Sequence, residues 1–338
     1  MKTRRIGKTA LEVTEISFGG ASLGNLYQAI PNKDAEAVLD AAWNSGIRYF
    51  DTAPHYGFGL SERRFGDFLR DKPRDGYALS TKVGRLLKPA PEHEVPNLGF
   101  FNPLPFKLEY DYSYDGIMRS VEFSYARLGL NRIDILYVHD IGVYTHGIEL
   151  TKVHLGQLLG GGIKALEELK SGGVISAYGL GVNEVEICVE VMRRAPLDCI
   201  LLAGRYSLLD RSAEAELLPL CHQSGTTLVI GGVFNSGILA TGAKPGSHFD
   251  YGPASPEILS KVSAMETIAE EAGYPLAAAA LQFPLHEKAV STVLIGTARA
   301  SSLTRNVDLL KIKVPEAEFE KYRPYTTVQP PLTGAVRE

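Results

Sequence analysis

Short apolar runs alternate with longer helical patterns along nearly the whole chain, and this alternation constrains the fold more than any other feature. The runs are rich in Ile, Val and Leu and are apolar on both faces, which is typical of parallel strands covered by helices. Helices between such strands carry the chain back to the start of the next one. We expect strands at residues 15–19, 47–51, 78–82, 133–139, 174–182, 199–202, 227–230 and 292–295.

The intervening helical patterns have the stripes and terminators of surface helices. In the first, Ala35, Val38, Leu39 and Ala42 form one apolar stripe, and Gly46 follows as a terminator. Further helices are expected at residues 61–69, 114–128, 162–171, 184–193, 212–222, 256–272, 275–286 and 300–309.

This succession of strand–helix units favours an α/β fold, specifically a closed (β/α)8 TIM barrel. Residues 3–7 and 11–14 are expected to form an N-terminal β-hairpin that closes the barrel bottom. Because no Pro- or Ser-rich linker divides the chain, we expect residues 1–338 to form a single domain. A doubly wound sheet is the alternative, but the nearest glycine motif, at residues 19–24, lacks the Gly-x-Gly-x-x-Gly spacing.

Two expected connections, at residues 86–113 and 140–161, are too long to be simple turns. Both follow strand C-termini, the end at which barrel active sites lie. Ordered loops of this length usually cover or shape a pocket, although surface decoration is the alternative. Their aromatic and histidine side chains are Phe100, Phe101, Phe106, Tyr110, Tyr112, Tyr144, His146 and His154.

Charge and composition make several classes of partner improbable. The formal net charge of −4 leaves no basic patch for nucleic acid or an acidic membrane surface. No run approaches the ~20 consecutive apolar residues of a membrane span, and the basic N-terminus lacks the apolar region of a signal peptide. Cys188, Cys199 and Cys221 lack paired or metal-ligand spacing. We expect a cytoplasmic protein without a metal, a monomer or small homo-oligomer, acting on a small molecule.

Ionisable side chains mark the C-terminal ends of three successive expected strands. Asp51, Lys82 and His139 end the second, third and fourth strands, and Tyr56 lies in the loop after Asp51. A free phenol has a pKa of about 10, and a nearby ammonium paired with a carboxylate favours the phenolate. We therefore expect these four side chains to form a proton-transfer site in which Tyr56 gives a proton to an alkoxide or takes one from an alcohol.

Each of the four also has a structural alternative. Asp51 can cap a turn before Pro54, Tyr56 can be a packing residue, Lys82 a solvated amine and His139 a core histidine. Their shared position at strand ends favours the catalytic interpretation. A metal site is less well supported, because the histidines after His139 lack ligand spacing.

A second group of candidates lies in the last third of the chain. The expected strand at 227–230 leads into the glycine-rich segment 231–237, and the last strand leads into Gly296, Thr297 and Ala298, before a helix that contains Asn306. Barrels often hold a cofactor phosphate with the loops after these two strands and a helix N-terminus. Ordinary turn chemistry is the alternative.

Taken together, these motifs resemble the aldo-keto reductase superfamily over essentially the whole chain. The matching features are Asp51 with Tyr56, and residues 80–82, 137–139, 181–183 and 295–306. The resemblance implies that Asp51, Tyr56, Lys82 and His139 are the catalytic tetrad and that Asn183 and Asn306 hold a nicotinamide dinucleotide. The cofactor-binding candidates are Asn183, Tyr206, Gly232, Val233, Phe234, Asn235, Gly237, Gly296, Thr297, Ala298, Ser302 and Asn306.

Within the superfamily, the chain is most similar to the group of aldose 1-dehydrogenases, L-fucose dehydrogenase and pyridoxal 4-dehydrogenase. The cues are residues 82–87, 111–116, 138–140 and 145–147. This resemblance implies oxidation of the anomeric carbon of an aldose, such as L-fucose, D-arabinose or a galactose, to the lactone. The alternatives are oxidation of pyridoxal to 4-pyridoxolactone, general NADPH-linked aldehyde reduction, and a nicotinamide-binding regulatory subunit without rapid turnover.

Several positions depart from the family pattern. Ala203 stands where many members have glutamine, Gly231 where an aromatic ring is usual, and Val233 where proline is common; Tyr206 or Phe234 are expected to compensate. Gly296 and Ser302 replace two cations that often bind the 2′-phosphate of NADP. Because an unpaired phosphate is costly to desolvate, we expect NAD as the cofactor, with NADP possible through Arg299 and Arg305.

Overall fold

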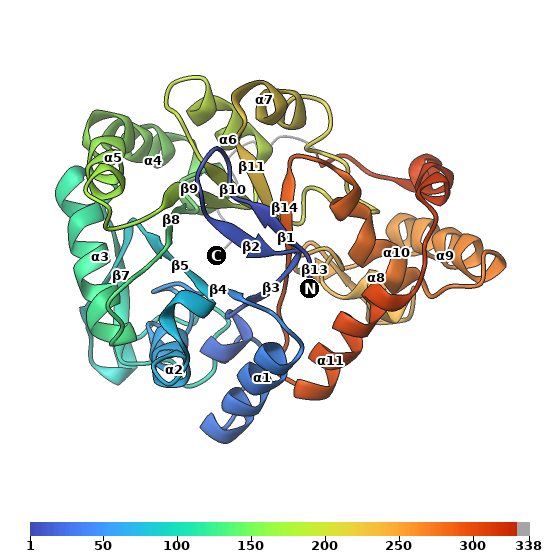
Figure 1. The fold of residues 1–338 in the computed structure, drawn as a ribbon, viewed down its shortest axis with the longest axis horizontal. Helices are drawn as coiled ribbons and strands as arrows, with labels where there is room; N and C mark the ends of the chain where they lie inside the picture. The colour runs from blue at the N-terminus through green and yellow to red at the C-terminus, as the bar shows by residue number, and fades with distance from the viewer. Residues whose placement is uncertain (330–338) are drawn as a thin grey trace.

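The computed structural model, which describes residues 1–329, contains a closed barrel of parallel strands surrounded by helices (Figure 1). This confirms the predicted (β/α)8 TIM barrel. Several strands begin later than expected, because residues such as 174–176 approach the barrel as bends and turns. In their order around the barrel, the strands are β3 (Ile16–Gly19), β4 (Tyr49–Asp51), β5 (Ala78–Val83), β8 (Ile135–His139), β9 (Ala177–Val182), β10 (Cys199–Ala203), β11 (Thr227–Gly231) and β14 (Val290–Ile295).

The expected outer helices are present, with two informative changes. The predicted helix at 212–222 begins only at Leu217, because the backbone and hydroxyl of Ser212 both donate to the Asp210 carboxylate and hold a turn. The predicted helix at 275–286 ends in a 3-10 turn that contains Pro284. The helices are α1 (Asn32–Asn44), α2 (Leu60–Leu69), α3 (Tyr114–Leu128), α5 (Ile163–Ser171), α6 (Val185–Met192), α7 (Leu217–Ser224), α9 (Pro256–Glu271), α10 (Leu276–Gln282) and α11 (Ala300–Asp308).

A hairpin of β1 (Thr3–Arg5) and β2 (Glu12–Thr14) closes the barrel bottom, as predicted. Ile6 and Val13, both fully buried, belong to one apolar cluster with inward-facing residues from the starts of the strands, among them Ala78 and Ile135. Burial of these side chains in the barrel interior stabilises the hairpin and seals the N-terminal end.

The two long connections are more regular than expected. Residues 86–113 contain most of an antiparallel hairpin, β6 (Arg85–Pro89) with β7 (Phe106–Tyr110). Residues 140–161 were expected to be a loop but form the helix α4 (Val143–Gln157), which continues into a π-helical turn. The buried face of α4 carries His146, Thr151 and His154 rather than an apolar stripe, and Gly147 at φ 67° interrupts it, which explains why the hydrophobic pattern did not predict a helix.

Shorter elements complete the chain between β11 and α9. They are α8 (Ile238–Thr241), β12 (His248–Phe249) and β13 (Gly252–Pro253). Within residues 1–329, no helix has the length and apolarity that crossing a bilayer requires.

Candidate active site

A buried ion pair joins the C-terminal ends of two neighbouring barrel strands. Lys82 Nζ donates to Asp51 Oδ2 at 2.6 Å and to the Thr52 carbonyl oxygen at 2.9 Å. The side chains of Lys82 and Asp51 are each 1% exposed. Because β4 and β5 are parallel neighbours in register, the two side chains meet directly above the barrel interior, as the sequence predicted.

The carboxylate of this pair is held from below by a chain of hydroxyl groups. Ser80 Oγ donates to Asp51 Oδ1 at 2.6 Å and accepts a hydrogen bond from the Tyr49 hydroxyl at 3.0 Å. Tyr49 in turn lies 2.9 Å from the Tyr137 hydroxyl. Burial raises the pKa of the Asp51 carboxyl, while Lys82 and Ser80 oppose the shift. With both oxygens bonded, the carboxylate fixes the position of the ammonium.

Tyr56 and His139 lie beside this pair, with their rings edge to face. Their ring centroids are 5.9 Å apart at an interplanar angle of 89°, and Lys82 Nζ lies 4.9 Å from the centroid of the Tyr56 ring. The structure therefore brings together all four residues that the sequence singled out.

The protonation states of Tyr56 and His139 follow from burial. Burial raises the pKa of the Tyr56 phenol well above its usual value, and the Asp51 and Asp140 carboxylates add to the shift. Burial also lowers the pKa of His139 far below that of a free imidazole, helped by the nearby cations Arg85 and Lys82. At neutral pH, Tyr56 is a phenol and His139 is a neutral imidazole. Burial therefore outweighs the effect expected from a nearby ammonium, which by itself favours the phenolate.

Sequence reasoning missed a second ion pair next to His139. Arg85, the first residue of β6, donates from Nη2 to Asp140 Oδ2 at 2.6 Å, and the same oxygen lies 3.4 Å from His139 Nε2. A signal was available, because Arg85 follows shortly after Lys82 and Asp140 directly follows His139. Neither position ends an apolar run, so the rule that identified the other residues did not apply.

A tyrosine and a histidine from the two long connections support His139 from outside the barrel. The Tyr112 hydroxyl donates to the His139 carbonyl oxygen at 2.7 Å and lies 2.9 Å from His146 Nε2. Burial lowers the pKa of His146 to about 3, so its imidazole is neutral. His146 packs against His154 with ring centroids 4.4 Å apart. Among residues 1–329, no group of three or more His, Cys, Asp or Glu side chains is arranged to hold a metal ion.

Aromatic rings cover one side of the site. Phe100, from the β6–β7 connection, contacts His55 edge to face at 5.1 Å and lies 6.4 Å from the Tyr56 ring. Its backbone pairs with Leu26, which anchors the connection over the barrel end. Phe101 is instead 54% exposed. The expected aromatic cover is therefore present at Phe100.

The cofactor candidate Asn183 lies next to Ala203 and Gly231, the two small residues that depart from the family pattern, and together they form a floor with little side-chain relief. Ala203 and Gly231 are register partners at the ends of β10 and β11, and a Cβ built on Gly231 would lie 3.5 Å from the Cβ of Ala203. Asn183 Nδ2 lies 3.5 Å from the Ala203 carbonyl oxygen and 3.1 Å from the Tyr251 hydroxyl. Small side chains with an adjacent amide fit a flat ring that bears a carboxamide.

The segment after β11 is partly structural. Val233 belongs to the apolar core, and Asn235 is buried, accepting a hydrogen bond from Ser207 and donating to the Gly204 carbonyl oxygen. Gly232 is exposed at φ 67°, and Gly237, at φ 96°, precedes α8. Phe234 is half-buried against the core. Of the candidates predicted in this segment, Gly232, Phe234 and Gly237 are the ones that are not buried.

As predicted, the last barrel strand leads through residues 296–298 into a helix that contains Asn306. Gly296 is exposed, and Thr297 and Ala298 are half-buried, with the Thr297 carbonyl oxygen accepting a hydrogen bond from Ser22. Ser302 and Asn306 are half-buried on α11 and share one face of the helix.

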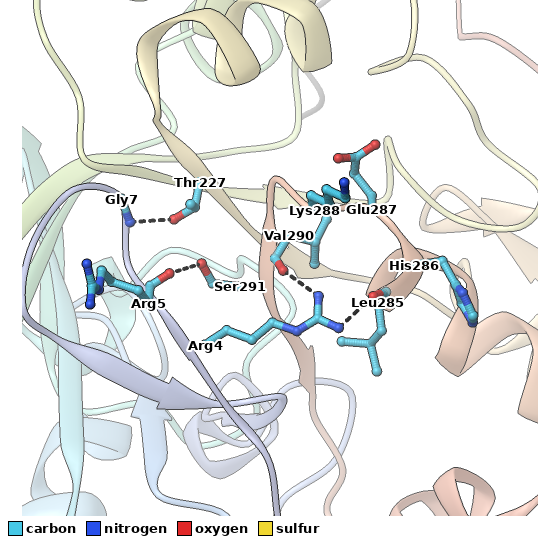
Figure 2. A pocket seen from close by; sticks show the side chains of 10 residues that line it. All are labelled: Arg4, Arg5, Gly7, Thr227, Leu285, His286, Glu287, Lys288, Val290 and Ser291. Carbon is cyan, nitrogen blue, oxygen red and sulfur yellow. Dashed lines mark hydrogen bonds between the residues drawn. The ribbon is translucent and has the colours of Figure 1, made fainter.

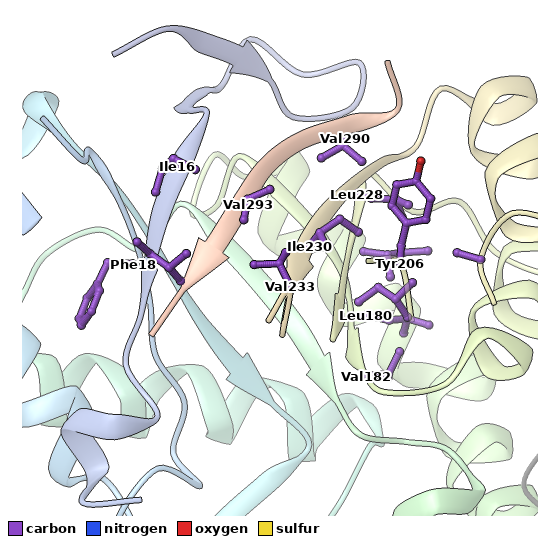
Figure 3. Close-up of a cluster of buried hydrophobic side chains, with 14 of the residues drawn as sticks. Ile16, Phe18, Leu180, Val182, Tyr206, Leu228, Ile230, Val233, Val290 and Val293 are labelled. Atoms are coloured by element: carbon purple, nitrogen blue, oxygen red, sulfur yellow. The ribbon is translucent and has the colours of Figure 1, made fainter. Parts of the chain in front are cut away.

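Tyr206 does not lie with the other candidates. The chain turns at Gly204 (φ 74°), and Tyr206 is buried against Phe283 with ring centroids 5.1 Å apart. Figure 3 shows its ring beside Leu228 and Val290, near the starts of β11 and β14. Tyr206 therefore belongs to the core at the opposite end of the strands and does not compensate for Gly231.

A solvent-open hollow of about 490 Å³ lies elsewhere, at the bottom of the barrel (Figure 2). It lies beside the hairpin and is lined by Thr227 and Val290, which begin β11 and β14. Arg4 crosses it and donates to the carbonyl oxygens of Val290 and Leu285 at 2.9 and 2.6 Å. Its position separates it from the tetrad by the length of the barrel.

Comparison with known proteins supports this architecture. The family model described as "Aldo/keto reductase family" matches residues 15–324. The chain is 47% identical over 323 residues to pyridoxal 4-dehydrogenase from Microbacterium luteolum, covering 93% of this chain and 94% of the relative. It is 40% identical over 310 residues to D-threo-aldose 1-dehydrogenase from a Pseudomonas species, covering 90% and 92%. The solved structure of aldo-keto reductase AKR11C1 from Bacillus halodurans, in its holo form, aligns with a TM-score of 0.77 at 26% identity, covering 100% of this chain and 98% of that one.

The buried ion pair predicts a specific stability pattern. Lys82→Met should lower the free energy of unfolding by about 3–5 kcal/mol, because it leaves the Asp51 charge buried without its partner. Adding Asp51→Asn to Lys82→Met should recover a large part of that loss. Urea denaturation measures all three proteins.

Lys88→Met is the matched control, since Lys88 pairs with Glu109 at 3.3 Å while 40% exposed. Its effect should stay within about 1 kcal/mol. Equal costs for Lys82→Met and Lys88→Met, or no recovery in the double variant, would show that burial of the charge does not govern this site.

Proposed function

Because the chain belongs to the aldo/keto reductase family, it is an NAD(P)-dependent oxidoreductase acting on CH–OH groups, and we propose that it oxidises a cyclic hemiacetal to a lactone. The substrate we propose is an aldose such as L-fucose, D-arabinose or a galactose, oxidised at its anomeric carbon. The 40% identical D-threo-aldose 1-dehydrogenase supports this choice.

The observation that carries the proposal is the position of Tyr56 and His139 beside the buried Lys82–Asp51 pair. Oxidation of a hemiacetal breaks a C–H bond, with the electron pair leaving as hydride, and an O–H bond, whose proton needs an acceptor, while the C=O bond of the lactone forms. The acceptor we assign is Tyr56 Oη in its phenolate form, after the phenol has released its own proton to solvent. The fixed ammonium of Lys82 lowers the cost of forming the phenolate. Neutral His139 is assigned to hold the hydroxyl oxygen in place.

The chain holds its coenzyme, in this proposal, with the floor of Ala203 and Gly231, the amide of Asn183, the open positions after β11 and the segment after β14. When bound, the nicotinamide ring supplies the acceptor for the hydride. We propose NAD as the preferred form, because Gly296 and Ser302 offer no cation to a 2′-phosphate.

Pyridoxal is the second candidate substrate, favoured by the 47% identity to pyridoxal 4-dehydrogenase. Its cyclic form is also a hemiacetal, so the same four residues would perform the same proton transfer. The difference lies in what surrounds the reacting carbon, a pyridine ring in one case and a hydroxylated sugar ring in the other.

The deciding experiment follows reduced nicotinamide by absorbance, with NAD and NADP each offered against L-fucose, D-arabinose, L-galactose, D-galactose and pyridoxal. We expect rapid reduction of NAD with at least one sugar. Reduction with pyridoxal alone would transfer the assignment to the second candidate. Absence of turnover with all five, together with rapid NADPH oxidation by simple aldehydes, would contradict hemiacetal oxidation. Absence of turnover in both hemiacetal oxidation and aldehyde reduction would favour a nicotinamide-binding regulatory subunit.

Replacing Tyr56 tests the proton transfer directly. Tyr56→Phe should lower kcat by at least ~100-fold, because the oxygen that accepts the proton as a phenolate is gone while the ring remains. Dinucleotide binding, followed by protein fluorescence, should change little. Wild-type rates in this variant would refute the role assigned to Tyr56.

Coenzyme choice is tested on α11. Ser302→Arg should shift the NADP/NAD ratio of kcat/KM toward NADP by roughly tenfold, because a guanidinium pairs with the 2′-phosphate. Ser301→Arg is the matched control, since it adds the same charge at the neighbouring exposed position of the same helix. Equal ratios in the two variants would show that Ser302 does not face the ribose.

A further inference from the structure

We propose that Asp140, held in place by Arg85, accepts a hydrogen bond from the substrate hydroxyl on the carbon next to the reacting carbon. Asp140 then selects hemiacetals that carry a hydroxyl there, the C2 hydroxyl in an aldose. This inference rests on the proposed function and adds a specificity-determining residue to it.

The position of Asp140 beside His139 is the first argument. Asp140 Oδ2 lies 3.4 Å from His139 Nε2, and the Tyr56 and His139 rings lie edge to face with centroids 5.9 Å apart. A reacting oxygen held by Tyr56 and His139 therefore lies close to Asp140. The hydroxyls of neighbouring ring carbons are themselves about a hydrogen-bond length apart. A C2 hydroxyl is thus within reach of the Asp140 carboxylate.

The openness of Asp140 is the second argument. Its side chain is 19% exposed, whereas its partner Arg85 is 4% exposed and the Lys82 and Asp51 side chains are each 1% exposed. Within residues 1–329, its hydrogen bond to Arg85 and its contact with His139 both use Oδ2. The second carboxylate oxygen has no hydrogen-bond partner among these residues. A partly exposed carboxylate beside His139, with one oxygen free, is suited to accept a hydrogen bond from a ligand hydroxyl.

The rigidity of the pair is the third argument. Asp140 adopts φ 41°, a left-handed conformation that is uncommon outside glycine, and its backbone N–H donates to the Gly181 carbonyl oxygen at 2.9 Å. Arg85 donates to the carboxylate at 2.6 Å and lies 5.5 Å from the Tyr110 ring centroid. Because both the backbone and the carboxylate of Asp140 are held by hydrogen bonds, its side chain loses little conformational entropy when it binds a hydroxyl. The free energy of this contact is therefore available to discriminate between substrates.

A charged carboxylate accepts a stronger hydrogen bond than a neutral amide does, so replacing Asp140 by asparagine should weaken its bond to a substrate hydroxyl by a measurable amount. Hydrogen bonds to charged groups are roughly twice as strong as neutral ones, and their loss corresponds to about 10- to 100-fold in kcat/KM. Asp140→Asn keeps the shape of the side chain and removes the charge. The loss should appear only when the substrate carries the hydroxyl that Asp140 reads.

The experiment is a cycle of two enzymes and two substrates. kcat/KM is measured with NAD for the wild type and Asp140→Asn, on D-galactose and 2-deoxy-D-galactose or on L-fucose and 2-deoxy-L-fucose, whichever sugar the wild type oxidises faster. The intrinsic reactivities of the two sugars cancel in the ratio of ratios. We expect Asp140→Asn to lose at least tenfold on the parent sugar and less than about threefold on the deoxy sugar.

Glu109→Gln is the matched control, because it removes one carboxylate charge at a position 47% exposed on β7, where Glu109 pairs with Lys88. This variant should keep the wild-type preference for the parent sugar. Dinucleotide binding by fluorescence, measured without any sugar, shows whether Asp140→Asn is folded. The wild-type preference for parent over deoxy sugar needs no variant and tests the proposal even if Asp140→Asn does not fold.

The outcomes separate this inference from the proposed function. Wild-type turnover without preference for the parent sugar overturns the role of Asp140 and leaves hemiacetal oxidation standing. Equal losses by Asp140→Asn on both sugars do the same, because they assign Asp140 a structural role only. Turnover of pyridoxal alone, or of no hemiacetal, overturns the aldose assignment and this inference with it.

Discussion

The site depends on placing an ammonium and a carboxylate out of reach of water and against each other. Either charge alone would be costly to bury, so the buried positions of Lys82 and Asp51 each require the presence of the other. Ser80 donates a hydrogen bond to the second oxygen of Asp51, and the Tyr49 hydroxyl donates to Ser80. These bonds fix the carboxylate, which in turn holds the ammonium of Lys82 near the Tyr56 ring. The parallel register of β4 with β5 places Asp51 opposite Ser80, and Lys82, two residues further along β5, reaches the same carboxylate.

Much of the fold and the tetrad was predictable from the chain, because one rule covers both. Apolar strands that alternate with helices must be parallel, and parallel strands in a closed barrel present their C-terminal ends on one face. Asp51, Lys82 and His139 each stand where an apolar run ends, so the rule that identified the strands also grouped the side chains. Asn183 was identified only through the family resemblance.

The rest depends on contacts between segments distant in the sequence. The buried face of helix α4 carries histidines rather than aliphatic side chains, and His146 lies within hydrogen-bond distance of Tyr112. Because histidine is not hydrophobic on a hydropathy scale, the helical period of this face does not show in the hydropathy pattern. Tyr206 is placed by the turn at Gly204 and by Phe283, which lies far along the chain. The Arg85–Asp140 pair joins residues from different connections, and no local pattern reports that they meet.

The hairpin of β6 and β7 is a separate two-stranded sheet that shares no ladder with the barrel. It nevertheless carries Arg85 at its base and leads to Phe100 at its far end, so one insertion supplies both a charge and a ring to the mouth of the site. The four residues to which we assign proton transfer come instead from the barrel strands β4, β5 and β8 and from the loop after β4. In the proposed function, a change of substrate within this family is then expected to arise in this hairpin and at Asp140, rather than in the strand ladder of the barrel.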